Sequence, residues 1–264
     1  MSNLIIVTAL LLLVTRLSVV AHANDLAGYL QASQEFEALF SQTAKEGRAP
    51  RLVDRNVADL IRVLSDSKRY LDETTYEVKD LLLLSDVCGK ANAAVMSYGL
   101  FDHGNAIDRN ADATRISLQV AQLMERNVVR FQDELQHLQP FLIRCLAKQI
   151  PLLGDFIVSL PPAELTDVRR GGVQGARQGA FGAFYGFLQV ANHRALKDSY
   201  KEAVLRVMAD TAPQYASFLP LTTRRQVADV AASVSTVVPG RLRGYVEQIL
   251  RAMKDTRCEG LCRF

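Results

Sequence analysis

The feature that most constrains the fold is an apolar periodicity of three and four residues, which runs through almost the whole chain after residue 24. Residues on one face of an α-helix recur at this spacing, whereas a half-buried strand alternates at every second residue. No stretch of the sequence alternates in that way. The sequence therefore predicts an all-α multi-helix bundle of about nine or ten helices, in a single helical domain over residues 24–264.

The expected helix boundaries follow from glycine and proline. Helices are expected to begin near Leu26, Leu52, Tyr76 and Ile116, and a loop rich in turn-forming residues separates the last two at 99–110. Proline lacks a backbone donor and interrupts a helix interior. We therefore expect Pro140 and Pro151 to bracket a short helix, and Pro213 and Pro239 to separate the last helices.

The overall charge excludes one class of function. The chain has 31 Lys and Arg residues against 28 Asp and Glu residues, and 49% of its residues are hydrophobic. A nucleic-acid-binding protein needs a clear excess of cations to neutralise phosphates. We therefore expect a globular protein with no nucleic-acid partner.

The first residues resemble an export signal. Leu4 to Val14 are apolar except for Thr8, and Ala21-His22-Ala23 fits the small residue pattern before a cleavage site. The alternative, an uncleaved anchor, is disfavoured because the run is well short of the roughly 20 residues that span a bilayer. We expect a cleaved signal peptide over 1–23 and export to the periplasm or the extracellular space.

Four cysteines lie after this segment, and an even number in an exported chain favours disulfides. Cys258 and Cys262 flank a short loop, so the favoured pairing is Cys258 with Cys262 and Cys88 with Cys145. A zinc site is not expected, because the only close pair has no histidine after it. The sequence predicts neither a metal nor a cofactor.

The most unusual segment is rich in glycine and lies between residues 171 and 190. At about 100° per residue, Gly175, Gly179, Gly182 and Gly186 fall on one line of a helix, and the aromatic residues project elsewhere. Each glycine inside a helix costs about 1 kcal/mol relative to alanine, so such a line needs a reason.

Three interpretations of this segment remain open. The favoured one is a buried helix with a neighbouring backbone drawn close along the glycine line. In the second, glycine leaves room for an apolar ligand, with Gly179, Gly182, Phe184 and Tyr185 as binding residues. In the third, the helix at 171–190 lies on a membrane surface.

The loop at 101–112 concentrates polar residues and is the best place to look for chemistry. Its candidate residues are Asp102, His103, Asp108 and Asp112. Asp108 and Asp112 begin a spacing typical of an EF-hand, but Ala113 stands where that loop needs glycine. We expect instead that Asp108 or Asp112 caps the following helix.

No catalytic motif occurs in the sequence, whereas the apolar periodicity is strong. The leading expectation is therefore an exported, non-catalytic protein that binds a partner protein or an apolar small molecule. The first alternative is a hydrolase-type enzyme that uses His103 with Asp102 or Asp108. The second is a peripheral membrane protein.

Overall fold

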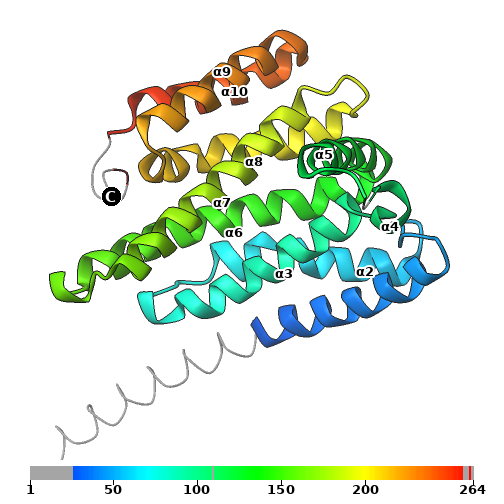
Figure 1. The fold of residues 1–264 in the computed structure, drawn as a ribbon, viewed down its shortest axis with the longest axis horizontal. Helices are drawn as coiled ribbons and strands as arrows, with labels where there is room; N and C mark the ends of the chain where they lie inside the picture. The colour runs from blue at the N-terminus through cyan, green and yellow to red at the C-terminus, as the bar shows by residue number, and fades with distance from the viewer. Residues whose placement is uncertain (1–25, 109, 258–261, 263–264) are drawn as a thin grey trace, which may run out of the picture.

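The computed structural model describes residues 26–108, 110–257 and 262 (Figure 1). This part of the chain is helical and contains no strand, which confirms the all-α prediction. A first helix covers residues 26–45. The later α-helices are α2 (Arg55–Leu64), α3 (Leu81–Gly99), α4 (His103–Ala106), α5 (Ala113–Arg130), α6 (Gln132–Ser159), α7 (Asp167–Ala191), α8 (Asp198–Phe218), α9 (Leu221–Val237) and α10 (Gly240–Asp255).

Helix α6 lies at the centre of the molecule. The helices from the first part of the chain pack on one side of it, and α8 and α10 lie on the other (Figure 1). Leu135, Leu138, Phe141, Leu142 and Ile143 of α6 are all buried. The buried apolar side chains form one continuous core around this helix.

The expected breaks at three prolines are wrong. Pro140 and Pro151 both lie inside α6, and Pro213 lies inside α8. Each proline removes one hydrogen bond from a helix interior, at a cost of about 3 kcal/mol. Burial along both helices offsets that cost, so tertiary packing decides where the helices end. Pro239 does separate α9 from α10, as predicted.

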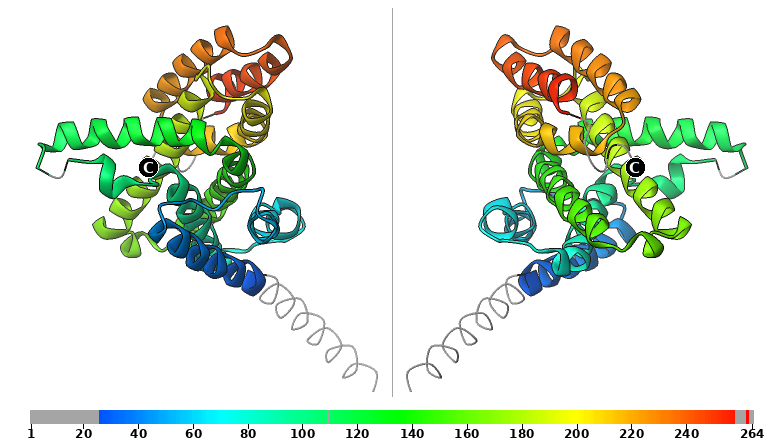
Figure 2. Two further views of the ribbon diagram at one scale, coloured as in Figure 1. Left: turned by 90° about the vertical axis from the view of Figure 1, so that its right-hand side faces the viewer. Right: turned by 90° about the vertical axis from the view of Figure 1, so that its left-hand side faces the viewer.

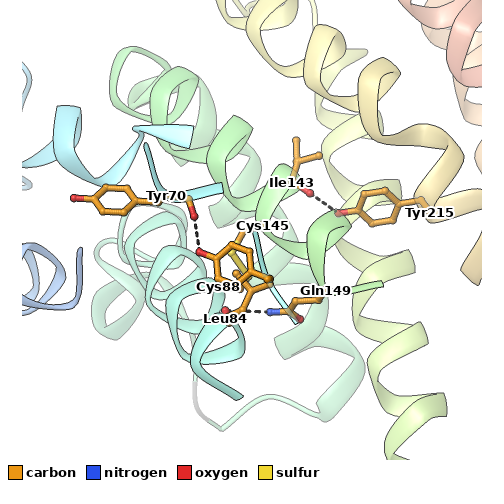
Figure 3. Close-up of a disulfide and its surroundings, with 8 residues drawn as sticks. Tyr70, Leu84, Cys88, Ile143, Cys145, Gln149 and Tyr215 are labelled. Atoms are coloured by element: carbon orange, nitrogen blue, oxygen red, sulfur yellow. Dashed lines mark hydrogen bonds between the residues drawn. A yellow bond between two sulfur atoms is a disulfide. The ribbon is translucent and has the colours of Figure 1, made fainter. Parts of the chain in front are cut away.

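A disulfide joins α3 to α6, as predicted, between Cys88 and Cys145 (Figure 3). Both cysteines are buried. Neighbouring hydrogen bonds also fasten α6, because Gln149 Nε2 donates to the Leu84 carbonyl and the Tyr215 hydroxyl donates to the Ile143 carbonyl. Cys262 is disulfide-bonded as well, whereas Cys258 and the predicted signal peptide lie outside the described residues.

Two arginines close the C-terminal end of α8. Nε of Arg177 donates to the Phe218 carbonyl at 3.1 Å, and Nε of Arg224 donates to the Leu219 carbonyl at 2.9 Å. Arg224 also donates to the Thr256 carbonyl beyond the end of α10. Carbonyl groups at helix C-termini carry partial negative charge, so they compensate the buried cation of Arg224. Burial nevertheless lowers the pKa of Arg224.

Candidate functional site

Helix α7 has two unlike faces. Ala180, Phe184 and Leu188 are buried, and the Phe184 and Tyr215 rings lie 4.4 Å apart between their centroids. Gly175, Gly179 and Gly182, on the other face, are exposed. Thr166 begins the helix, because its hydroxyl oxygen accepts a hydrogen bond from the backbone of Arg169.

In the part of the chain that the structure describes, no other helix approaches the glycine line. A β-carbon added at Gly175, Gly179, Gly182 or Gly186 would meet no atom of these residues within 4 Å. The expectation of a neighbouring backbone drawn close along this line is therefore wrong. Because the glycines are not required for packing, the line leaves open space beside α7.

That space is part of a groove of about 980 Å³. Helix α7 forms one wall, and α5 forms another with Ala121 and Met124. Figure 2 shows α5 standing out from the body of the molecule, so the groove lies beside the inner part of this arm. The volume is at the upper end of the range of about 300–1,000 Å³ that is typical of small-molecule sites.

The floor of the groove is apolar and buried. It comprises Val95 of α3, Val128 of α5, Leu135 of α6 and Leu196 of the segment before α8. Gln139 is the polar exception, with only 2% of its surface exposed. An apolar surface with few polar groups is typical of sites for apolar small molecules.

The rim is more polar than the floor. Nε2 of His193 lies 3.4 Å from a carboxylate oxygen of Glu125, which links α5 to the segment after α7. Nδ1 of His193 accepts a hydrogen bond from the backbone of Ala195 at 3.2 Å. Asn192 and the exposed Arg194 complete this end of the groove.

The structure separates the four binding candidates of the glycine-rich segment. Gly179 and Gly182 line the groove, whereas Phe184 and Tyr185 do not. Phe184 belongs to the core, and the Tyr185 ring lies 5.2 Å from that of Phe181. The aromatic side chain that does line the groove is Phe187.

Sequence reasoning missed the contribution of the other helices to this site. Met96 and Gln139, for example, lie far apart in the sequence and line the same groove. Neither belongs to a recognisable motif, and Met96 fits an ordinary apolar helix face. The packing of α3 and α7 against α6 brings them together with Gly182, and periodicity does not predict that packing.

The described residues of the polar loop at 101–112 lie mostly at the surface. His103 is exposed, and among the described residues no hydrogen bond or ion pair joins its side chain to Asp102 or Asp108. Asp102 has a positive φ of 66° and accepts a hydrogen bond from Asn105. Asp112 caps α5 by accepting from the backbone of Arg115 at 2.9 Å, which confirms a capping role.

No cluster of three or more His, Cys, Asp or Glu side chains in the part of the chain that the structure describes is arranged to hold a metal ion. Within the same residues, no helix combines the length and apolarity that crossing a membrane requires. Comparisons of the chain with protein-family models, with curated proteins and with solved structures each found no match.

Proposed function

We propose that this protein binds an apolar small molecule in the groove between α5 and α7 and performs no chemistry on it. The observation that carries the proposal is the open glycine face of α7 above an apolar floor. The glycines at positions 179 and 182 make the helix less stable than alanine would, and they contribute no packing. Room for a ligand is the benefit that accounts for both residues.

Export is part of this proposal. The Cys88–Cys145 disulfide fits a compartment that oxidises thiols, such as the periplasm or the extracellular space. The hydrolase alternative is less well supported, because His103 and its proposed partners are exposed and lie outside the groove. The membrane-surface alternative for 171–190 is also less well supported, because Phe184 and Leu188 face the core.

The test compares two leucine substitutions on α7 by titration with N-phenyl-1-naphthylamine, a neutral apolar dye. Gly182 lines the groove and Gly175 does not, yet both have open space around them. We expect Gly182→Leu to fold normally by circular dichroism and to weaken dye binding by about tenfold. Gly175→Leu should fold and bind as the wild type does.

Other results would count against the proposal. If the wild type binds no dye, and native mass spectrometry of protein purified without reducing agent shows no associated molecule, the groove is not a ligand site. Unfolding of Gly182→Leu would show that the glycine face is packed after all. Equal loss of dye binding in both variants would place the dye elsewhere on α7.

Binding of a partner protein is the second candidate function. The observation that favours it is that the open glycine face continues past the groove to Gly171, Gly172 and Gly175. Glycine allows another helix to approach the backbone closely. Gly175→Leu separates the two functions, because it should block a partner helix and leave binding of a small molecule unchanged.

A further inference from the structure

One polar side chain on the floor of the groove is only partly satisfied. Gln139 of α6 is 2% exposed, and its Oε1 accepts a hydrogen bond from the hydroxyl of Tyr200 on α8. Its amide nitrogen Nε2 makes no hydrogen bond with any described residue. Gln139 lines the groove, so this unused donor is available to a molecule inside it.

The pair with Tyr200 fixes which end of the amide is free. Tyr200 is fully buried, and burial raises the pKa of its hydroxyl, so the hydroxyl stays neutral and can donate. If the amide were rotated, Nε2 would face the hydroxyl oxygen and the buried hydroxyl proton would lose its acceptor, since no described residue other than Gln139 accepts from it. Nε2 is not one of the fully buried polar atoms that lack a partner, so it borders the open groove, and a ligand acceptor there would take the place of water.

The surroundings of Gln139 favour a neutral acceptor over a carboxylate. Val128, Leu135 and Leu196 belong to the same floor as Gln139, and no cationic side chain of the described residues lies among them. One neutral donor does not compensate a charge that has been removed from water. Among the described residues that line the groove, the cationic side chain is that of Arg194, which belongs to the rim.

We propose that the ligand is a neutral apolar molecule with a carbonyl-type oxygen, such as an ester or ketone, which accepts a hydrogen bond from Gln139 Nε2. This inference rests on the proposed function, since it names the ligand class of the same groove. The apolar body of the ligand lies against the glycine face of α7. Gln139 then fixes the orientation of a molecule that the apolar walls alone would leave free to slide.

The experiment measures displacement of N-phenyl-1-naphthylamine by three molecules that share an eight-carbon chain: octane, methyl octanoate and octanoate. The readout is the ratio of the dissociation constants for octane and methyl octanoate. We expect Gln139→Leu to weaken binding of methyl octanoate about fivefold relative to binding of octane, as the loss of one neutral hydrogen bond predicts. Gln136→Leu, which removes an amide on the same helix outside the groove, should leave the ratio unchanged.

A second variant guards against a folding defect. Gln139→Leu leaves the Tyr200 hydroxyl buried without an acceptor, whereas the double variant Gln139→Leu/Tyr200→Phe removes both polar groups. Replacing both partners of a buried hydrogen bond by apolar groups is often nearly neutral for stability. The same fivefold shift is expected in the double variant.

The contrary outcomes separate this inference from the proposed function. If Gln139→Leu and the double variant keep the wild-type ratio, the carbonyl contact is wrong while the groove remains a ligand site. If octanoate binds more tightly than the ester and Arg194→Gln removes that preference, the polar group lies at the rim and the inference is overturned. If neither the dye nor any of the three molecules binds the wild type, the proposed function itself fails.

Discussion

The two faces of α7 differ in role: the inner face packs against the core, and the outer face borders the groove. On the inner face, Phe184 is fully buried, and its ring packs at a tilt against that of Tyr215 of α8. On the outer face, Gly179 and Gly182 border open space. The inner face secures the position of the helix, so the outer face can leave a groove unfilled without loosening the fold.

The largest expected effect is a loss of stability when the buried face of α7 is truncated. Phe184→Ala should lower the free energy of unfolding by about 4 kcal/mol, because it leaves a cavity in a packed layer. Phe187→Ala on the same helix should cost no more than about 1–2 kcal/mol, because Phe187 borders the groove and is already partly exposed. Urea unfolding of both variants checks this, and equal losses would contradict the contrast between the faces.

The second prediction concerns the link between α3 and α6, which both contribute to the floor of the groove. Replacing Cys88 and Cys145 together by alanine should lower the free energy of unfolding by about 3 kcal/mol, mainly because the unfolded chain gains freedom. Thermal unfolding without reductant measures the loss. Dye binding well below the midpoint should persist, and its disappearance would show that the disulfide holds the floor in place.

These contrasts mark what the sequence could and could not predict. The apolar periodicity predicted the helical class, and the four cysteines predicted the link between Cys88 and Cys145. Proline rules failed at Pro140 and Pro151, because burial along α6 outweighs a local backbone penalty. Sequence reasoning singled out the glycine line but did not place α5 beside it, since the position of an arm depends on contacts between distant residues.

The third prediction sharpens the contrast by leaving the groove open while removing the backbone penalty. Gly179→Ala and Gly182→Ala should each raise the free energy of unfolding by about 0.5–1 kcal/mol, because alanine favours helix and the added carbon meets nothing. Urea unfolding measures the gain. Dye affinity should change little, in contrast to Gly182→Leu. A loss of stability would mean that the glycine face has a structural role.

The smallest expected effect concerns the protonation of His137 on α6. His137 is near the N-terminal end of this helix, and burial lowers its pKa below the ordinary value of 6.5, although Asp133 and Glu134 oppose that shift. The folded state therefore binds a proton less readily than the unfolded state, so this residue reduces stability as the pH falls below 6.5. Because His137 keeps an exposed edge, solvent limits the effect to a few tenths of a kcal/mol. Urea unfolding at pH 7.5 and at pH 5.0 should show a slightly larger decrease for the wild type than for His137→Gln, and a larger decrease for the variant would show that the carboxylates outweigh the burial.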